Sequence, residues 1–385
     1  MAHFVTKISD IIEFNPRETI ARKQVCKKVP MEYLQPFTRQ ISGFEEAPYA
    51  GGTKFRNNDT IMARITPCLE NGKTAFVKGF AENEVVFGST EYIVMRAIPG
   101  ASDPVFIYYL ATSPSFREVA IKSMVGSSGR QRVQQDVLEN LELVLPDYET
   151  QVRVGKVLSA FDDKIELNTQ INHNLEEQAR AIFREYFQPH EKVVPLGSLC
   201  QCLLGGTPNR NKSEFWGGDI PWINSGKVNE FRITTASEYI TDSGFKNSST
   251  KLLPCHTTVI AITGATLGQV SLLEIASCAN QSVVGVLPNE NVPFTFIYPF
   301  IKDNILELIS NQTGGAQQHI NKQNVESLPV PCYSAALIAE YHERVSPLYE
   351  QISNNCFESE RLTDLRDLLL PKLMSGEIDV SEVEI

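Results

Sequence analysis

The feature that most constrains this chain is an internal repeat that spans most of its length. Residues 130–143 (RQRVQQDVLENLEL) align with residues 317–330 (QQHINKQNVESLPV) at an offset of 187 positions, and the match continues without a gap through the segment that follows. Upstream the offset is nearer 198, where residues 60–66 (TIMARIT) match residues 258–263 (TVIAIT). Self-similarity over this length predicts two similar folded blocks.

Each block contains short apolar runs broken by Gly, Pro, Asn and Ser, a pattern that favours strands and turns over long helices. Apolar stretches at 104–124 and 293–310 predict a helix after the strands of each block. We therefore expect a mixed α/β (α+β) fold with a pseudo-two-fold internal repeat. The predicted segments are domain 1 (residues 1–147), a central helical segment (148–188), domain 2 (189–333) and a C-terminal helical segment (334–385).

Both helical segments carry apolar residues at alternating steps of three and four, over residues 158–186 and 345–373. This is the spacing of the a and d positions of a coiled coil. Ser159 and Ser346 suit N-cap positions and Pro347 suits the first helical position, so we expect the long helices to begin there, each after a short helix. Burial of the stripe against the helix's own domain is the commoner alternative.

Two polar residues interrupt each apolar stripe near its middle. If the helices pair in opposite directions, with partner numbers that sum to 527, Asn168 meets Ser359 and Asn172 meets Asn355. A buried polar layer of this kind fixes the register of a helix pair at some cost in stability. A parallel pairing also aligns these residues, but antiparallel pairing is favoured because each helix must hand the chain to the opposite domain.

The expected interface between the two helices draws on both stripes. Arg366 interrupts the second stripe opposite Phe161, and we expect its charged end to reach solvent along its aliphatic stem. The remaining interface residues are predicted to be Ile165, Asn168, Asn172, Leu175, Ile182, Leu348, Ile352, Asn355, Ser359, Leu362 and Leu369.

Composition and charge limit the classes of protein. The chain has 385 residues, of which 42% are hydrophobic and 21% are charged, so a folded soluble protein is expected. There is no apolar run of roughly 18 residues and no signal-peptide layout at the N-terminus, so we expect a cytoplasmic location. The net charge of −11 is concentrated at the C-terminus: 334–385 carries −7, whereas 1–147 is neutral and 189–333 carries −2. Local DNA-binding patches on the two domains are compatible with this distribution.

Motifs for catalysis or metal binding are absent from the sequence. The eight cysteines form no C-x-x-C pair and the six histidines are scattered singly, so no metal site is expected. Neither a glycine-rich G-x-G-x-x-G loop nor a phosphate-binding G-x-x-x-x-G-K-S/T motif occurs. Acidic residues beside lysines, such as Glu70 and Lys73, arise often by chance and do not indicate a nuclease. We therefore expect a non-catalytic chain that binds no cofactor.

Four motifs resemble those of a known family in the order that the family requires. The run LRDLLLPKLMSGEI (365–378) resembles the C-terminal signature of type I restriction-modification specificity subunits, and LEEQARAIFREYF (175–187) resembles the end of their central conserved helix. The runs GGTPNRNKSEFWGGDIPWINSGKV (205–228) and DTIMARITPCLENGKTAFV (59–77) resemble forms of the second and first target-recognition domains.

The resemblance implies a fold and a set of partners. The two domains would each read one half of a split DNA site, and the two helices would form an antiparallel spacer that docks two modification (methyltransferase) subunits. Restriction subunits, which act as translocase and nuclease, would complete a complex for phage defence. S-adenosylmethionine, ATP and Mg²⁺ would be bound by those partner subunits, whose assembly would be an adenine-specific DNA methyltransferase and ATP-dependent endonuclease.

Base readout requires forked or amide side chains on loops, and phosphate contact requires Lys, Arg or turn N–H groups. The repeat places glycine-rich loops with such side chains at corresponding positions of the two domains. The candidates in domain 1 are Arg64, Lys73, Arg130, Gln131, Arg132 and Gln134. The candidates in domain 2 are Asn209, Arg210, Lys212, Trp222, Ser225, Lys227, Gln317, Gln318, His319 and Asn321. The alternative for each is a solvated turn, with Trp222 in the core.

Two other functions remain compatible with the sequence alone. One is the recognition arm of a different restriction or methylation enzyme whose catalytic part is another chain. The other is a scaffold that does not bind DNA, in which two repeats support a coiled coil for protein assembly. A scaffold would show no salt-dependent affinity for a DNA duplex, whereas contacts to phosphates make affinity fall steeply with salt.

Overall fold

The structure is a computed structural model that describes residues 3–127, 129–189, 191–310 and 320–380. The chain forms two compact units, unit 1 (Met1–Glu166 with Glu360–Ile385) and unit 2 (Leu167–Ser359). Two long helices, α4 (Tyr148–Tyr186) and α8 (Ala335–Ser375), each contribute residues to both units. Among the described residues, no helix combines the length and the apolar character needed to cross a membrane.

Three sheets form domain 1, the globular part of unit 1. One parallel pair, β3 with β8, interrupts an otherwise antiparallel arrangement. In spatial order the sheets are β1 (His3–Lys7) with β10 (Glu142–Pro146); β2 (Ile12–Phe14), β9 (Tyr92–Ala97), β6 (Thr60–Ala63) and β7 (Thr74–Phe76); and β4 (Glu45–Pro48), β3 (Val25–Val29), β8 (Val86–Gly88) and β5 (Lys54–Phe55).

Domain 2, the globular part of unit 2, has the same three sheets in the same spatial order. Its parallel pair, β13 with β18, corresponds to β3 with β8. The sheets are β11 (Val193–Pro195) with β20 (Pro329–Pro331); β12 (Cys202–Leu204), β19 (Val283–Val286), β16 (Thr258–Ala261) and β17 (Val270–Leu272); and β14 (Glu238–Ile240), β13 (Trp216–Ile223), β18 (Ser277–Ala279) and β15 (Leu252–Leu253). This shared topology confirms the predicted repeat and the mixed α/β fold.

Helices follow the strands in both domains, as the apolar stretches predicted. Domain 1 has α1 (Pro104–Thr112) and α2 (Pro114–Lys122), and domain 2 has α6 (Phe294–Ser310). Helix α1 begins where Asp103 accepts a hydrogen bond of 2.9 Å from the amide of Phe106, with a proline at the first helical position. A short helix precedes the last strand of each domain, α3 (Gln135–Glu139) and α7 (Lys322–Glu326), and domain 2 also contains α5 (Asp242–Lys246).

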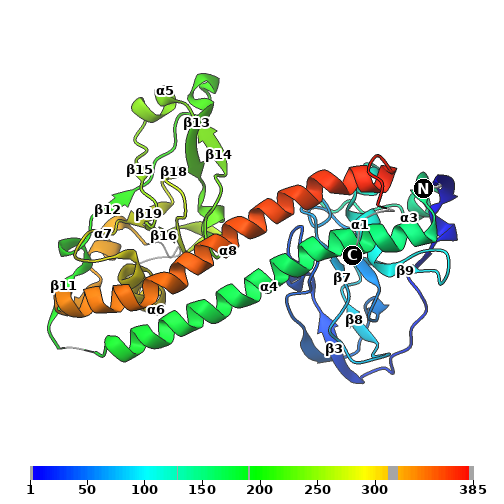
Figure 1. Ribbon diagram of the computed structural model, residues 1–385, viewed down its shortest axis with the longest axis horizontal. Coiled ribbons are helices and arrows are strands. Elements are labelled where there is room, and N and C mark those ends of the chain that lie inside the picture. The colour runs from blue at the N-terminus through cyan, green and yellow to red at the C-terminus, as the bar shows by residue number, and fades with distance from the viewer. Residues whose placement is uncertain (1–2, 128, 190, 311–319, 381–385) are drawn as a thin grey trace. The chain divides into compact units, whose positions relative to one another are not determined.

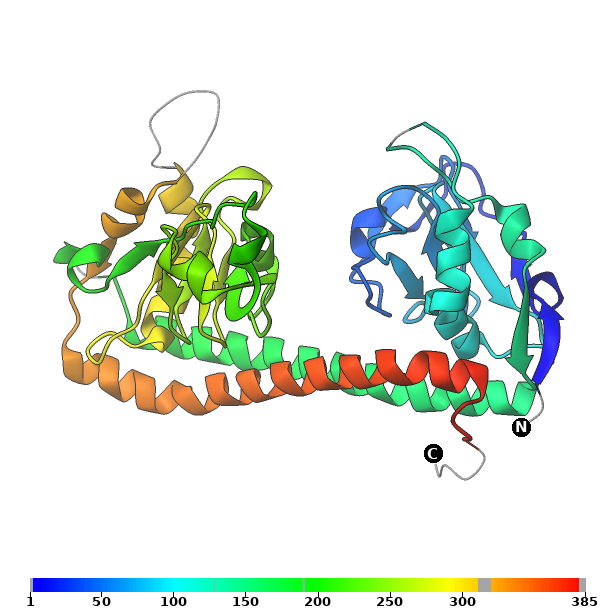
Figure 2. The same cartoon turned by 90° about the horizontal axis from the view of Figure 1, so that it is seen from above.

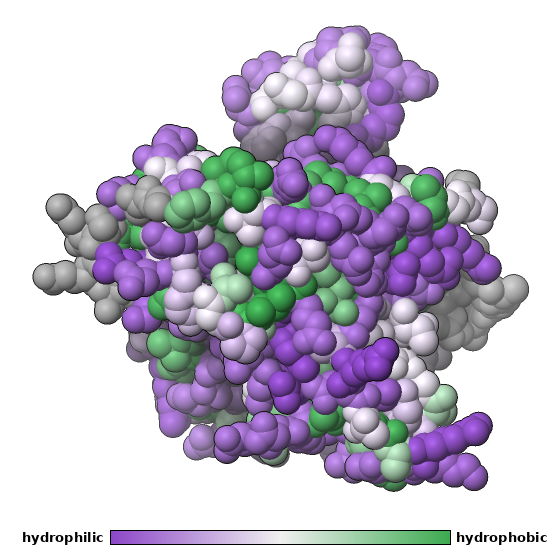
Figure 3. Space-filling model, turned by 90° about the vertical axis from the view of Figure 1, so that its right-hand side faces the viewer, coloured by the Kyte–Doolittle hydropathy of each residue, from purple (hydrophilic) through white to green (hydrophobic). Residues whose placement is uncertain are grey.

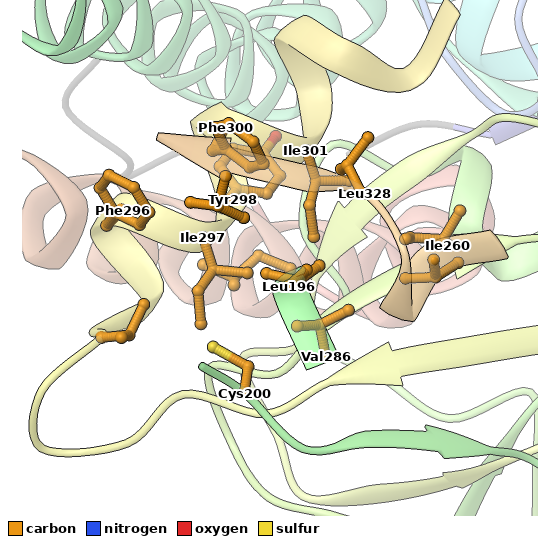
Figure 4. Packing of buried hydrophobic residues seen from close by; sticks show 14 of the residues in the cluster. Leu196, Cys200, Ile260, Val286, Phe296, Ile297, Tyr298, Phe300, Ile301 and Leu328 are labelled. Carbon is orange, nitrogen blue, oxygen red and sulfur yellow. The ribbon is translucent and has the colours of Figure 1, made fainter. Parts of the chain in front are cut away.

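The largest core of unit 2 lies between α6 and the neighbouring sheet, and it includes side chains of α4 and α8 such as Phe183 and Tyr341. Figure 4 shows residues of α6 packed beside residues of β16 and β19. The residues labelled there are Leu196, Cys200, Ile260, Val286, Phe296, Ile297, Tyr298, Phe300, Ile301 and Leu328. Unit 1 is built in the same way: its core includes Leu158 of α4 and Leu373 of α8. Neither domain is therefore complete without the helices.

Within each unit a segment of α4 lies beside a segment of α8 that runs in the opposite direction (Figures 1 and 2). In unit 2, Asn168 Nδ2 donates to Ser359 Oγ over 3.2 Å, and Asn355 Nδ2 donates to Asn172 Oδ1 over 2.8 Å. These partner numbers sum to 527, so the antiparallel register is the one that the polar residues indicated. Asn168 and Asn172 are buried, as is Asn355.

The predicted starting points of the long helices are wrong. Helices α4 and α8 each begin 11 residues before those serines, at Tyr148 and Ala335. Asp147 accepts a hydrogen bond of 2.9 Å from the amide of Thr150, and Ser334 accepts one of 3.2 Å from that of Leu337. These two capping residues stand at repeat-equivalent positions, 187 apart.

The serines expected to be caps lie inside the helices instead. Ser159 Oγ donates to the carbonyl of Lys156, and Ser346 Oγ donates to that of His342. Pro347 therefore lies within α8, where it has no N–H to donate to the preceding turn. A Ser-Pro pair is the sequence pattern of a helix start, because proline is tolerated at the first helical position, so the local sequence favours a boundary that the structure does not have.

Arg366 does not extend to solvent, so the expectation that its charged end reaches the surface is wrong. Only 8% of its surface is exposed, and its guanidinium binds the carboxylate of Asp162 on α4 and that of Asp367. Asp162 is itself buried and accepts a hydrogen bond of 2.6 Å from Tyr109 of α1. A buried arginine requires charged and polar partners, and this cluster supplies them within unit 1.

A buried arginine also ties each domain to α4. Arg39 of domain 1 binds Asp163 and Glu166, and Arg232 of domain 2 lies 3.2 Å from Glu176. Both arginine side chains are at most 5% exposed, and their partners Glu166 and Glu176 are 12% and 7% exposed, so these two ion pairs are largely shielded from water, whereas Asp163 is 62% exposed. Removal of one partner from such a pair is strongly destabilising because it leaves a buried charge without compensation. Each domain is thereby fixed to the helix segment of its own unit.

Candidate nucleic-acid interface

In domain 1 two predicted loops lie side by side because their backbones are hydrogen-bonded. The amide of Val133 donates to the carbonyl of Arg64 over 2.9 Å, and the amide of Thr66 donates to the carbonyl of Gln131 over 3.0 Å. The glycine-rich loop closes on itself through reciprocal backbone bonds between Val125 and Arg132. The structure thus brings the 64–73 and 125–134 segments together into one polar surface.

Arg132 has the most defined geometry of these candidates. Its Nε and Nη2 atoms donate to both carboxylate oxygens of Glu91 over 2.7–3.1 Å, and 44% of its side chain remains exposed. The hydrogen bonds from Arg132 hold the pKa of Glu91 below its usual range, so the carboxylate is charged at neutral pH. A two-point contact of this kind orients the guanidinium while its Nη1 edge still faces the loop, where it makes a long contact of 3.4 Å to the carbonyl of Arg130.

The other members of the cluster differ in their exposure and in the contacts that they make within the protein. Arg130 is exposed, and its guanidinium has no acidic partner among the described residues. Gln131 is half-buried and Gln134 occupies the N-cap position of α3 without a capping bond from its side chain. Arg130 is therefore the charged group of this loop that is available to a phosphate.

The side chains of Arg64 and Lys73 donate hydrogen bonds to backbone carbonyls within domain 1. Arg64 Nη2 donates to the carbonyl of Val133 over 3.2 Å, and Lys73 Nζ donates to that of Met31 over 2.9 Å. The loop between them is held from the other side by Arg117, which donates to the carbonyls of Leu69 and Glu70. These contacts stiffen the surface, and they leave Arg64 and Lys73 only half exposed.

In domain 2, Arg210 is held in the same manner as Arg132. Its two terminal nitrogens donate to the carboxylate of Glu238 over 2.6 and 2.8 Å, and its guanidinium lies 3.7 Å from the ring centre of Trp216. The hydrogen bonds from Arg210 lower the pKa of Glu238 below its usual range. About half of the Arg210 side chain, 49%, remains exposed. The sequence does not indicate either carboxylate, because Glu91 and Glu238 lie far from their arginines in the chain and follow no repeat spacing.

Four further candidates of domain 2 lie on two turns, Asn209 and Lys212 beside Arg210 in the chain and Ser225 and Lys227 in the 3-10 turn after β13. Asn209 is exposed and its side chain accepts a hydrogen bond from the amide of Asn211, while Lys212 is exposed and lies over the ring of Phe215. Lys227 is only 18% exposed and is paired with Glu230. Ser225 is half-buried at the start of a 3-10 turn. Asn209, Arg210 and Lys212 therefore form the accessible part of this group.

Trp222 is not available to DNA, which corrects the prediction. The residue is 2% exposed, and its indole N–H donates to the carbonyl of Gly206 over 3.1 Å. It packs with Ile240 and Cys278 in a small core of domain 2. The alternative stated for Trp222, burial in the core, is therefore the one that holds.

The repeat partner of the Arg130 loop falls partly outside the described residues. Gln317, Gln318 and His319 lie there, so nothing is established about their positions. Asn321 caps α7, with its side chain and backbone exchanging hydrogen bonds of 2.9 Å with Asn324. The amide of Ile320 donates to the carbonyl of Ile262 over 3.0 Å, which repeats the bond between Val133 and Arg64 in domain 1.

Two copies of one mixed α/β domain, each docked on paired helices and each bearing a half-exposed arginine that is held by a carboxylate, define a protein with duplicated recognition modules. A family model for the type I restriction modification DNA specificity domain matches residues 4–177 and 190–332. The chain therefore belongs to this family, and the two matched segments correspond to its two repeats.

Curated relatives carry matching descriptions. The chain is 25% identical to the type I restriction enzyme HindI specificity subunit of Haemophilus influenzae, over 88% of this chain and 90% of that protein. It is 24% identical to the MjaIX specificity subunit of Methanocaldococcus jannaschii, over 72% and 70% of the two chains. A crystal structure of a type I restriction-modification system S subunit from M. genitalium shares the fold, with a TM-score of 0.54 and 16% identity over 97% and 96% of the chains.

Proposed function

We propose that this chain is the DNA-specificity subunit of a type I restriction-modification complex, in which each target-recognition domain reads one half of a bipartite DNA site. The paired helices α4 and α8 set the spacing of the two half-sites and dock two modification subunits. Catalysis belongs to those partners: methyl transfer to adenine from S-adenosylmethionine, and, with restriction subunits, ATP- and Mg²⁺-dependent translocation and cleavage. The complex would act in the cytoplasm against phage DNA.

One observation carries this proposal beyond the family match. The same backbone hydrogen bond, from Val133 to Arg64 in domain 1 and from Ile320 to Ile262 in domain 2, holds the residue two positions before α3 and before α7. In domain 1 the anchored stretch 125–134 carries Arg130 and Arg132 and contains no acidic residue. Arg130 supplies an exposed positive charge that can bind a phosphate, and Arg132, which is oriented by Glu91, can present its remaining N–H groups to a base edge.

The experiment is a fluorescence anisotropy titration of duplex DNA with the chain bound to its modification subunit. Two duplexes are compared. The first contains the methylated motif found in the host, and the second is the same duplex with one half-site scrambled. We expect affinity to fall by about 1–3 kcal/mol for each mismatched base pair in either half-site. We also expect the logarithm of the association constant to fall linearly with the logarithm of the salt concentration. The slope should be about −0.9 for each phosphate that is contacted.

Two outcomes would contradict the proposal in different ways. Equal affinity for the intact and scrambled duplexes would show a DNA-binding chain that does not read sequence. An affinity that is independent of salt would favour an assembly scaffold. Sequencing of methylated bases in a strain with and without the gene supplies the matched control, because a split adenine motif should be lost only when this chain is absent.

The face of the molecule in Figure 3 is mainly hydrophilic, with hydrophobic residues gathered in separate small clusters. This distribution is compatible with a subunit whose surface meets both DNA and proteins, because neither kind of contact needs one large apolar patch.

A further inference from the structure

Domain 1 carries an exposed phenylalanine that none of the contacts proposed above uses. Phe37 lies in the connection between β3 and β4, and 61% of its surface is exposed. A single exposed apolar residue needs no explanation by itself. Two further properties, its backbone conformation and the way in which it is held, distinguish Phe37 from the other exposed apolar residues of the described chain.

The backbone of Phe37 lies in the left-handed region, with a φ of 53°. A bulky residue is uncommon there, because its Cβ is crowded by the backbone. Asn adopts this conformation more readily, and Asn15, Asn58 and Asn83 are examples in the same domain. Strained backbone of this kind persists only where the surrounding structure holds it, and it is concentrated at functional sites. The chain therefore keeps an aromatic ring at a position that Asn or Gly would occupy with less strain.

The segment that contains Phe37 is bonded to the neighbouring 64–73 segment at two points. The amide of Phe37 donates to the carbonyl of Gly72 over 3.0 Å. Lys73 Nζ donates to the carbonyl of Met31, near the start of the same connection, over 2.9 Å. The two segments are thereby held together, and Phe37 is fixed from its backbone side.

The ring of Phe37 packs against Gly72 and Arg117. A Cβ at Gly72 would lie 2.5 Å from a carbon of the ring, so any side chain at position 72 would displace the ring. The guanidinium of Arg117 lies 5.3 Å from the ring centre, within the range of a cation–π contact. Arg117 is itself fixed by the hydrogen bonds that it donates to the carbonyls of Leu69 and Glu70. The ring thus stands on a rigid support while most of its surface is exposed.

Domain 2 shows that the supporting glycine can be covered without an exposed ring. Gly268 is the repeat counterpart of Gly72, since each immediately precedes the residue whose carbonyl accepts the amide of the last alanine of β16 or of β6. Both glycines have a positive φ, of 83° and 72°. The half-buried Ile309 of α6 covers Gly268. Packing over the glycine therefore accounts for an apolar residue at this place, but not for the exposed ring and strained backbone of Phe37.

Phe37 is continuous with the candidate DNA-reading surface of domain 1. The 64–73 segment, to which Phe37 is bonded, is bonded in turn to the 125–134 segment that carries Arg130 and Arg132. Exposed apolar side chains beside DNA-binding groups serve as wedges in some DNA-binding proteins, where they enter between neighbouring base pairs and kink the duplex. A side chain that is already fixed loses less entropy when it enters such a step. The position, exposure and rigidity of Phe37 all suit this role.

We propose that Phe37 is a wedge residue, whose ring inserts between two base pairs of the half-site that domain 1 reads. This inference rests on the proposed function, since it requires the half-site to lie on this surface. The flat apolar ring matches the faces of the bases, and such a contact does not depend on base identity in the way that hydrogen bonds do. Phe37 would therefore set the shape of the bound duplex, and the polar side chains beside it would read the sequence.

The test uses the chain bound to its modification subunit and a duplex that contains the methylated motif found in the host. Donor and acceptor dyes at the two ends of the duplex report bending through energy transfer, and anisotropy reports affinity. We expect the wild-type complex to raise energy transfer, because wedge residues kink a duplex by about 20–90°. Phe37→Asn suits the left-handed backbone but removes the ring. It should weaken binding about fivefold or more, the lower end of the range for an aromatic contact with a base, and should remove most of the bend.

Two further variants and one further measurement control for other effects. Phe37→Leu keeps an apolar wedge and should retain more of the bend than Phe37→Asn. Phe4→Asn is the matched control, because it removes a phenylalanine of similar exposure, 57%, from β1, and it should change neither bend nor affinity. In thermal unfolding, Phe37→Asn should melt at the wild-type temperature or above it, since Asn relieves the strain of the positive φ. A ring with only a structural role would lower the melting temperature instead.

Several results would overturn the wedge. One is a wild-type complex that reads the site but leaves the duplex straight. Another is a Phe37→Asn complex that bends the duplex as the wild type does, whatever its affinity. A third is a failure of Phe37→Asn to bind the modification subunit in gel filtration without DNA, which would place the ring in a protein interface. Failure of the proposed function looks different, because the wild-type complex would then bind the intact and scrambled duplexes equally.

Discussion

At the scale of single residues, the accessible arginines of the two domains share one arrangement. Arg132 and Arg210 are each gripped by both oxygens of a carboxylate, Glu91 or Glu238, and each is about half exposed. An arginine that is already oriented loses less side-chain entropy when it meets a base, so a fixed fork favours specificity. The carboxylates therefore act as positioning residues for the proposed readout.

We predict that Arg132→Ala lowers affinity for the cognate duplex by about 1–3 kcal/mol, because a forked contact to a base edge is worth that much. Glu91→Gln should lower it less, since the arginine stays but is oriented by weaker bonds. The measurement is anisotropy at fixed salt in the assembled complex. Arg22→Ala, which removes an exposed positive charge outside the loop, is the control; equal losses in Arg22→Ala and Arg132→Ala would mean that only net charge matters.

At the scale of elements, the polar layer of the helix pair decides register. Asn172 and Asn355 are both buried and bonded to each other over 2.8 Å, and Asn355 also accepts a bond of 2.7 Å from Gln351. A hydrogen bond between two buried amides contributes little net stability. Removal of one amide, however, leaves the other without a hydrogen-bond partner, which is costly. The layer therefore penalises other registers more than it stabilises this one.

We expect Asn172→Leu alone to reduce the free energy of unfolding by about 1–3 kcal/mol, because it leaves the amide of Asn355 without its partner. The double variant Asn172→Leu with Asn355→Leu should recover most of that loss, since an apolar pair can replace a buried polar one. Urea denaturation of the three proteins measures the difference. Additive losses in the double variant would show that the two amides are energetically independent.

The repeat, the fold class and the helix register could be predicted from the sequence, because each depends on a regular spacing of residues along the chain. The sequence did not predict the contacts that depend on residues outside those spacings. Arg366 was expected at the surface because its partner, Asp162, lies off the apolar stripe of α4. Trp222 was taken as a DNA contact because burial of an aromatic residue in a turn-rich segment leaves no periodic signal.

The same reasoning explains the helix ends. Ser346 with Pro347 is the pattern of a helix start, and nothing local shows that the helix had already begun at Ala335. The true caps, Asp147 and Ser334, were detectable in principle, because they are repeat-equivalent and each precedes a helical stripe. The repeat was therefore a better guide to helix boundaries than the local motif.

At the scale of the whole molecule, the uneven charge distribution sets how the chain meets DNA. The chain carries −11 in total, and residues 334–385 account for −7 of it. A negative surface slows encounters with a polyanion when the ionic strength is low, whereas short-range contacts are less affected by salt screening. The acidic segment 334–385 should therefore slow the association of this chain with DNA at low ionic strength.

We predict that Glu343→Gln with Asp364→Asn, two exposed acids of α8, raises the association rate with duplex DNA at low salt by roughly twofold to threefold. The gain should vanish near 0.15 M salt, where the screening length is about 8 Å. Stopped-flow fluorescence at several salt concentrations gives the rates. A gain that persists unchanged at high salt would indicate a local contact instead of a long-range field.

Unit 1 draws its core from both extremities of the chain, since Leu370, Leu373 and Met374 of α8 pack with side chains of the first 158 residues. A ribosome therefore releases domain 1 long before the residues that complete it have been made, and unit 2 emerges in between as an insertion. Nascent or prematurely terminated chains would present an unfinished apolar surface to chaperones and proteases. The apolar surface of domain 1 is therefore covered only after residues 370–374 of α8 have been made.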